Sequence, residues 1–229
     1  MIIARNCGTG SLLGIAVFFV EISMTCVAVS QQASPGHGIL EITGGLGVSA
    51  IGDPSIVDYM NSVAELSPDQ QLSEFTSAPE FFITPEVQFS DNWSIALEYS
   101  YMLKSYNSVG ASQWDFTYTA QMPSILLHYL MPGEGYCLKY GGGLGYAFGK
   151  FTEQYPITGS ELTSTASGPL VKIELVGNTE FDEHFWGSIG VDLRWVFAGV
   201  FKNSSVGTVA SPKLNFFSAG LKFGVTYEL

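Results

Sequence analysis

Residues 214–229 at the end of the chain read LNFFSAGLKFGVTYEL, and apolar and polar side chains alternate along them. The apolar set comprises Phe217, Ala219, Leu221, Phe223, Val225, Tyr227 and Leu229. The set between them is polar or glycine and comprises Ser218, Gly220, Lys222, Gly224, Thr226 and Glu228. Because neighbouring side chains of a strand point to opposite faces, the pattern predicts a strand with one apolar and one polar face. The alternation is longer than the ~5–6 residues of an ordinary strand and suits a tilted strand that crosses a bilayer.

The last part of this segment, KFGVTYEL at 222–229, resembles the C-terminal assembly signal of bacterial outer-membrane barrels. In that family a polar residue is followed by glycine, then by an aromatic residue and a large terminal residue. Lys222, Gly224, Tyr227 and Leu229 occupy these positions, and Leu229 stands where phenylalanine is commoner. The resemblance implies that these four residues are an assembly signal and that the barrel-assembly machinery is a partner of the chain.

The composition supports a membrane barrel. Charged residues make up 13% of the chain, about half of the ~25% usual in globular proteins, whereas aromatic residues make up 14%. The chain has 26 glycines, and beyond its N-terminal region no run of ~18 apolar residues could form a membrane-spanning helix. The formal net charge of −12 argues against nucleic acid as a partner, because phosphates require a basic surface.

The N-terminal region has the pattern of an export signal. An apolar core at 11–20 follows a basic residue, and the small residues at 28–30 suit a cleavage site, so we predict a signal peptide at 1–30 and a barrel domain at 31–229. The alternative is an uncleaved anchor helix at 12–29, in which Glu21 would cost a few kcal/mol. Cleavage removes two of the three cysteines and leaves Cys137, so no disulfide is expected within the mature chain.

Seven further segments alternate in the same way before the last one. The predicted strands are 37–50, 80–90, 93–104, 114–130, 136–151, 170–178, 185–201 and 214–229. The connections between them are in turn long, short, medium, short, long, short and medium, which is the rhythm of a barrel with short turns at one end and longer loops at the other. The sequence therefore predicts an all-β protein, an eight-stranded antiparallel up-and-down transmembrane β-barrel.

The first long connection, 51–78, is predicted to contain a short helix in the first outer loop. Asp53 can cap it, Pro54 suits its first turn, and apolar residues follow at helical spacing. These apolar residues are Ile56, Tyr59, Met60 and Val63.

The fourth predicted strand contains a break at Pro123. Before it, an apolar set would face outward, comprising Trp114, Phe116, Tyr118, Ala120 and Met122. After it, Ile125, Leu127 and Tyr129 would take over the outer face, which requires a bulge near Pro123. The strand register after Pro123 is open at this point.

The stretch around this break carries a second resemblance. MPSILLHYLMPGEGYCLKYGGGLGYAFG, which starts at Met122, is similar to the P-x-L-L-x-Y, turn, Y-x-x-x-G-x-G hairpin of the outer-membrane protein β-barrel domain families, relatives of OmpA, OmpX and OmpW. The resemblance implies a small barrel exported to the outer membrane of a Gram-negative bacterium, in contact with outer-membrane lipid and lipopolysaccharide.

Charged residues are concentrated on the face of small and polar residues, which we expect to line the lumen. The predicted lumen charge network comprises Glu41, Glu86, Glu98, Lys104, Lys139, Lys172, Glu174, Asp192, Arg194 and Lys222. A lumen of eight strands is just wide enough for side chains to fill it, and unpaired buried charges are costly. We therefore predict paired charges that plug the lumen.

The predicted outer loops and rim carry mostly carboxylates. These carboxylates belong to Asp53, Asp58, Glu65, Asp69, Glu74, Glu80, Asp115, Glu153 and Glu161. A solvated, repelling surface explains them, and binding of divalent cations is the alternative, since hard cations take carboxylate oxygens. No ligand spacing supports a specific metal site.

Catalytic patterns are weak. His37, His128 and His184 are the three histidines, and Ser124 precedes His128 by four residues in one strand, a spacing that does not itself bring the pair together. No zinc pattern, phosphate loop or nucleotide fingerprint is present, so we predict no catalytic residue, metal or cofactor.

We interpret the chain as a monomeric, non-enzymatic integral protein of the bacterial outer membrane, a structural or surface-contact scaffold with a plugged lumen. The first alternative is a narrow channel for small or apolar solutes. The second is a lipid-modifying hydrolase, which would need His128 on the outer face near a carboxylate and a serine.

Overall fold

The computed structural model describes residues 40–52, 54–63, 71, 77–108, 114–154, 161–203 and 213–229. The predicted signal peptide, 1–30, and the first three residues of the first predicted strand, 37–39, lie outside the described residues. No helix in these described ranges is long and apolar enough to cross a membrane.

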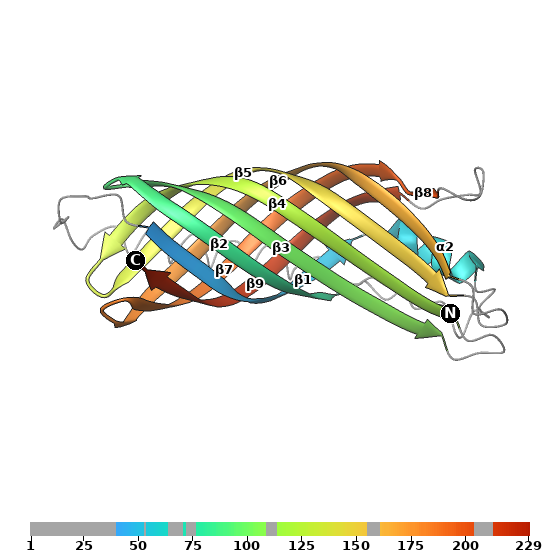
Figure 1. Ribbon diagram of the computed structural model, residues 1–229, viewed down its shortest axis with the longest axis horizontal. Coiled ribbons are helices and arrows are strands. Elements are labelled where there is room, and N and C mark those ends of the chain that lie inside the picture. Colours follow the sequence, from blue (N-terminus) through green and yellow to red (C-terminus); the bar gives the residue numbers. More distant parts are fainter. Residues whose placement is uncertain are drawn as a thin grey trace, which may run out of the picture. The chain divides into compact units, whose positions relative to one another are not determined.

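Eight long antiparallel strands close into a ring in the described part of the chain (Figure 1). They are β1 (Leu40–Gly52), β2 (Ala78–Ser90), β3 (Trp93–Ser108), β4 (Trp114–Gly133), β5 (Tyr136–Gln154), β6 (Glu161–Asp182), β7 (Phe185–Val200) and β9 (Lys213–Glu228). Each pairs with its neighbour in the chain, β1 pairs with β9 to close the ring, and the two-residue β8 (Lys202–Asn203) continues the line of β7 and pairs with β6. The predicted up-and-down barrel of eight strands is confirmed.

The two ends of the barrel differ. One end, here called the turn end, has the tight turns at 91–92, 134–135 and 183–184, and there the backbone N–H of Leu229 donates to the carbonyl of Leu40. The other end, the helix end, carries α2 (Pro54–Val63), which confirms the helix predicted in the first loop (Figure 1).

The outer face of the barrel carries an apolar belt. Large apolar side chains alternate along every strand and remain exposed because they point away from the lumen. The belt comprises Leu46, Val48, Phe81, Ile83, Phe89, Ile95, Leu97, Ile125, Leu127, Tyr140, Leu144, Phe148, Ile173, Ile189, Phe197, Leu221, Phe223 and Val225. A closed ring with such a belt satisfies its backbone hydrogen bonds internally and presents only apolar atoms to lipid. Apart from the first part of β4, the predicted outward faces are confirmed.

The first part of β4 is reversed relative to the prediction. Phe116, Tyr118, Ala120 and Met122 are buried inside the barrel, not outward. The predicted bulge at Pro123 is absent, because β4 pairs with β3 in one unbroken register. The reason is that the strands extend beyond the belt. There the outer face meets water and carries Thr, Gln and Lys, whereas the inner face is apolar.

The fifth and sixth strands are also longer than predicted. β5 ends at Gln154 and β6 begins at Glu161, so most of the predicted loop at 152–167 is strand. Its outward side chains are all polar, and its inward ones include the polar or small Glu153, Ser164 and Ala166, so hydropathy alternates too weakly to be recognised.

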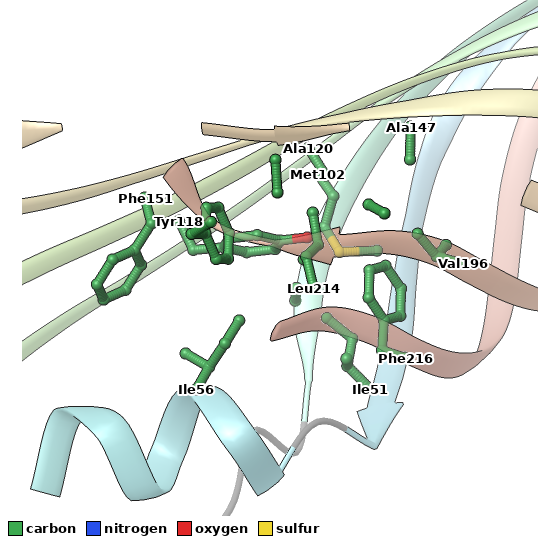
Figure 2. Close-up of a cluster of buried hydrophobic side chains, with 14 of the residues drawn as sticks. Ile51, Ile56, Met102, Tyr118, Ala120, Ala147, Phe151, Val196, Leu214 and Phe216 are labelled. Atoms are coloured by element: carbon green, nitrogen blue, oxygen red, sulfur yellow. The ribbon is translucent and has the colours of Figure 1, made fainter. Parts of the chain in front are cut away.

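An apolar core fills the lumen at the helix end. It includes Met102, Met122 and Phe216 from the strands and is closed by α2, whose Ile56 and Met60 are fully buried (Figure 2). The core comprises Ile51, Ile56, Val57, Met60, Ala78, Met102, Phe116, Tyr118, Ala120, Met122, Ala147, Phe151, Ala166, Leu170, Val196, Ala198, Phe201, Leu214 and Phe216. The helix therefore folds into the barrel mouth, a position that its sequence left open.

One carboxyl group lies in this apolar core. Glu153 is 1% exposed and accepts a hydrogen bond from the Tyr59 hydroxyl at 2.9 Å, while its second oxygen has no partner among the described residues. The group is outside the belt, since the outward neighbours of Glu153 on β5 are Lys150, Thr152 and Gln154. Burial raises the pKa of Glu153 above its ordinary value, and the Tyr59 hydrogen bond only partly opposes the shift. Glu153 was expected at a solvated rim, and this expectation is wrong.

Docking of α2 should therefore weaken as pH rises. Below the ordinary pKa of a glutamic acid, the Glu153 side chain is protonated and its burial carries no free-energy cost of charge. As pH rises through the raised pKa, the side chain ionises and the cost of burying its carboxylate develops. Hydrogen exchange of the α2 amides, corrected for intrinsic rates, should show more protection at pH 5 than at pH 8. Glu153→Gln should abolish this difference, whereas the exposed Glu161→Gln should preserve it. An unchanged pH dependence in Glu153→Gln would contradict the assignment.

Candidate functional site

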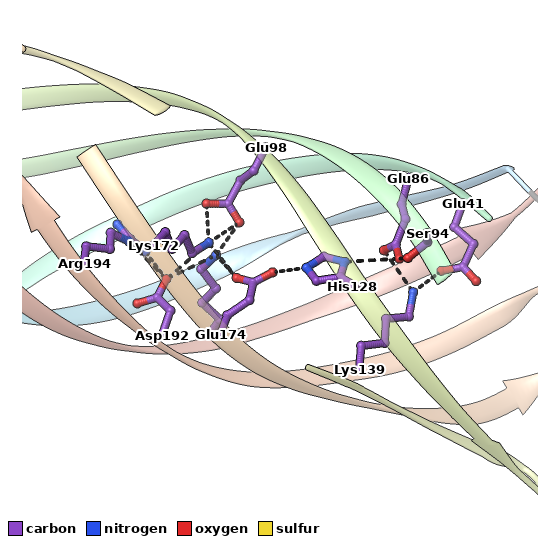
Figure 3. A network of polar contacts seen from close by, with 11 residues as sticks. Glu41, Glu86, Ser94, Glu98, His128, Lys139, Lys172, Glu174, Asp192 and Arg194 are labelled. Carbon is purple, nitrogen blue, oxygen red and sulfur yellow. Dashed lines mark hydrogen bonds and ion pairs between the residues drawn. The ribbon is translucent and has the colours of Figure 1, made fainter. Parts of the chain in front are cut away.

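Charged side chains occupy the lumen between the apolar core and the turn end. All eight long strands contribute to this lumen charge network, because their inward positions converge on one narrow interior (Figure 3). The network comprises Glu41, Glu80, Glu86, Glu98, His128, Lys139, Lys172, Glu174, Asp192, Arg194 and Lys222. All of them except Glu41 are buried.

The network starts near the turn end with Lys139. Its Nζ atom lies 2.5 Å from Glu41 Oε2 and 3.0 Å from Glu86 Oε2. Ser94 donates its hydroxyl to the other oxygen of Glu86. One lysine thus joins carboxylates from β1 and β2 across the lumen.

His128 connects this part of the network to the centre. Its Nδ1 atom lies 3.3 Å from Glu86 Oε1, and its Nε2 atom lies 2.9 Å from Glu174 Oε1 (Figure 3). Only the imidazolium form, with a proton on each nitrogen, can donate to both carboxylates. The ring edge also lies against the backbone of β5, where a methyl group on Gly141 would be 2.7 Å from His128 Cδ2.

Two lysines and two glutamates form the centre of the network. Lys172 Nζ lies 2.6 Å from Glu98 Oε1 and 2.6 Å from Glu174 Oε2. Lys222 Nζ contacts the same two carboxylates, at 2.5 Å from Glu98 and 3.4 Å from Glu174. Each carboxylate therefore faces two ammonium groups, and both ammonium groups also lie 3.4 Å from Asp192 Oδ2.

Arg194 ends the network next to the apolar core. Its Nη1 and Nη2 atoms each donate to one oxygen of Glu80 at 2.8 Å, the two-pronged geometry in which a guanidinium binds a carboxylate best. Its Nε atom donates to Asp192 at 3.1 Å, and Ser49 donates to Glu80 at 2.9 Å. A methyl group on Gly220 would lie 2.3 Å from Asp192 Oδ1, so the inward glycine leaves space for this carboxylate.

The charges of the network almost balance. Its six carboxylates face four Lys or Arg side chains, and protonated His128 provides a fifth positive charge. Isolated charges in so dry an interior would be very costly, and their pairing offsets this cost. A small cavity remains beside the network toward the turn end, with Asn178, Thr84 and His128 among its lining residues.

The structure brings nine of the ten residues predicted for the network together. Lys104 is not among them: its ammonium group donates to the carbonyl of Ser77 and lies 5.1 Å from the ring centre of Tyr106, near the helix end. Its side chain faces inward, but β3 extends beyond the charged part of the lumen at this point. Parity along a strand predicts the face of a residue and not its depth.

Sequence reasoning missed two members, Glu80 and His128. Glu80 was expected among the solvated rim carboxylates, and it is instead paired with Arg194 inside the barrel. The sequence pattern was sufficient to place both residues on the inward face. Glu80 and Glu86 share one face of β2, and the even-numbered inward positions of β4 include His128 once the break at Pro123 is discarded.

The four residues of the predicted assembly signal lie on both faces of the last strand. Lys222 belongs to the network, and Gly224 lies against the backbone of β1. Tyr227 points outward and packs against Phe185, with 5.0 Å between ring centres, and Leu229 is exposed. Their role in assembly is a proposal that the geometry does not test.

His128 does not face lipid. Its side chain is 2% exposed in the lumen, and the Ser124 hydroxyl bonds to the backbone carbonyl of Met122 at 3.5 Å. His184 lies in a turn, with its ring centre 6.1 Å from that of Tyr227. The arrangement that a lipid hydrolase would need around His128 is therefore not present.

The closed ring, the apolar belt and the charged lumen define a transmembrane β-barrel. No protein-family model and no curated protein sequence matches the chain.

Solved structures match most of the chain. A crystal structure of Ail, the attachment invasion locus protein of Yersinia pestis, in complex with the heparin analogue sucrose octasulfate, is 11% identical, with a TM-score of 0.56 over 85% of this chain and 100% of Ail. A second crystal structure of Ail is 12% identical, with a TM-score of 0.52 and the same coverage. The outer membrane protein OprG from Pseudomonas aeruginosa is 15% identical, with a TM-score of 0.49 over 87% of this chain and 99% of OprG. The likeness to Ail shows that the two chains share a fold.

Removal of Arg194 should destabilise the barrel strongly. Arg194→Ala leaves Glu80 buried without a cation and Asp192 with only Lys172 and Lys222, each at 3.4 Å, which costs about 3–5 kcal/mol of the free energy of unfolding. Urea unfolding in detergent micelles measures this loss. Lys104→Ala, which removes a base outside the network, should change the value by no more than about 0.5–1 kcal/mol. Equal stability of the two variants would contradict the network.

His128 should be energetically coupled to Glu174. His128→Leu leaves the two glutamates without the cation between them, so it should destabilise the barrel by about 3 kcal/mol or more. The loss of stability in His128→Leu/Glu174→Gln should be smaller than the sum of the losses in His128→Leu and Glu174→Gln, because each single variant already breaks the contact between the two side chains. Additive losses in the same unfolding assay would show that the ring does not bridge the carboxylates.

Proposed function

We propose that the chain is a non-enzymatic integral protein of the bacterial outer membrane that serves as a scaffold for surface contacts, with a lumen closed to ions. The observation that carries the proposal is that paired charges and apolar side chains occupy the described interior apart from the small cavity toward the turn end. The lumen charge network occupies one half, and the apolar core closed by α2 occupies the other. Among the described residues, every charged side chain of the network lies in at least one ion pair, although single polar atoms such as Asn178 Oδ1 and Asp192 Oδ1 are buried without a hydrogen-bond partner.

The scaffold role is supported by the shape of the helix end. The long strands β4, β5 and β6 continue past the belt at this end. Ail, which shares the fold, is by its name an attachment invasion locus protein. We therefore place the functional surface of this chain at the helix end and assign a structural role to the lumen.

The proposal includes export and assembly. Residues 1–30 would be removed as a signal peptide, and the barrel-assembly machinery would insert residues 31–229 as a monomer with the turn end in the periplasm. The loops of the helix end would then lie outside the cell.

A narrow channel for small or apolar solutes is the second candidate. It is favoured by the apolar lining of the helix end, where the contacts of α2 include that of Tyr59 with Phe151, at 6.0 Å between ring centres, and the hydrogen bond from the Tyr59 hydroxyl to Glu153. An opening at Pro123, which a lateral exit would need, is not supported, because β3 and β4 pair through this position.

Single-channel recording in a planar lipid bilayer distinguishes the two functions. The folded mature chain should be electrically silent, because the network and the apolar core exclude ions. The variant Ile56→Glu/Met60→Glu, which removes α2 from the core, should remain silent if the network alone closes the lumen. Steady conductance steps of the wild-type chain would overturn the proposal, and steps of the variant alone would assign the closure to α2.

A further inference from the structure

The bases outside the lumen network lie toward the helix end of the barrel. Among the described residues they are Lys104, Lys150, Lys202 and Lys213. Lys150 on β5 and Lys202 on β8 are exposed and both lie opposite Thr165 of β6, so the three residues form one row across the outer face. Neighbouring strands are ~4.8 Å apart, so the two lysine side chains can reach one anionic group between them.

Lys213 extends this row. It is exposed on β9 and lies opposite Val200, two residues before Lys202, which makes Lys202 and Lys213 diagonal neighbours. We call Lys150, Lys202 and Lys213 the lysine row.

The lysine row lies at the edge of the apolar belt. Phe148, two residues before Lys150 on the same face of β5, is 50% exposed, and Val200, two residues before Lys202, is 46% exposed. A lysine in this position can lay its aliphatic stem along apolar surface and extend its ammonium group to the polar boundary. The row is therefore placed where lipid acyl chains end and headgroups begin.

Hydroxyl groups surround the row on the outer face. Lys150 lies opposite Thr119 of β4 on its other side, and Thr152 pairs with Thr117 and Thr163 one step farther from the belt. These side chains are half-buried or exposed and point away from the lumen. They offer donors and acceptors suited to sugar hydroxyls next to the three ammonium groups.

The turn end has the opposite charge. Its turns and the adjoining strand ends carry Asp91, Glu134, Glu180, Asp182 and Glu183, and within the described ranges no Lys or Arg points outward there. The outer surface thus places its positive charge at only one of the two edges of the belt. This asymmetry is complementary to a membrane whose phosphates are concentrated in one leaflet.

We propose that the lysine row, with the threonines beside it, binds the phosphorylated sugar headgroup of a glycolipid in the outer leaflet. The phosphates would lie between Lys150, Lys202 and Lys213, the sugars on the threonine face of β4 to β6, and the acyl chains on the belt below. A glycolipid is favoured over a soluble polyanion because the row adjoins the belt, so one molecule can occupy both surfaces. The inference rests on the proposed placement of the barrel in the outer membrane.

The test uses the mature chain folded into phosphatidylcholine vesicles that contain a minor fraction of lipid A, either bis-phosphorylated or dephosphorylated. After gentle extraction into detergent, the lipid A retained per protein is measured by native mass spectrometry. The wild-type chain should retain the phosphorylated form preferentially, and the preference should fall about fivefold for each lysine replaced by glutamine. Lys150→Gln/Lys202→Gln/Lys213→Gln should lose it, whereas Lys104→Gln should keep it.

Retention of phosphorylated lipid A by the triple variant at the wild-type level would overturn the inference. Displacement of the lipid by inorganic phosphate or by a soluble sulfated oligosaccharide at equal anion concentration would also overturn it, by showing an anion site that does not need a membrane. Heat-modifiable migration in gels reports folding independently. A chain that does not insert into the vesicles would refute the proposed membrane placement itself, whereas a folded, inserted chain without lipid preference would refute only this inference.

Discussion

The rest of the structure depends on the pairing of charges within a closed ring of eight strands. The sheet must present apolar atoms to lipid, so its polar side chains are confined to a lumen that has little space for water. An ammonium or carboxylate group can remain there only with a partner, and the network provides one at every step from Lys139 to Arg194. Inward glycines such as Gly220 are part of this arrangement, because the carboxylate of Asp192 occupies the space that a side chain would fill.

The interior is built in two parts because the outer environment changes along the strands. Within the belt the outer face is apolar and the inner face is charged. Beyond the belt the outer face is polar, and the inner face becomes a conventional apolar core that α2 completes. The apolar side chains of β4 therefore lie on different faces at its two ends. Leu127 faces outward near the turn end, and Phe116 faces inward at the helix end. The helix is the element that closes the apolar half, and among the described residues Glu153 is the carboxyl group buried with it.

Stability and surface function involve different parts of the barrel, the lumen and the outer face. The lumen holds the strands together through contacts between side chains that are distant in sequence, such as Lys172 and Glu98. The outer surface carries its few bases at one edge of the belt, on neighbouring strands of the helix end. Under the proposed scaffold function, recognition would lie on the outer strands and loops, and the interior would contribute stability.

The sequence by itself determined the strand number, the order of the strands and the face of most side chains, because alternation with period two is a local property. It also placed nine of the network residues on the inner face. It could not determine depth, since a residue such as Lys104 or Glu80 has the same parity whether it lies in the charged half or at the rim. The alternation predicted the wrong face for the first part of β4. In a strand that continues from lipid into water, the apolar side chains change from the outer face to the inner face without any bulge. Only the tertiary structure decided that His128 bridges two glutamates and that α2 folds into the mouth, because both results depend on distances between strands that sequence patterns do not contain.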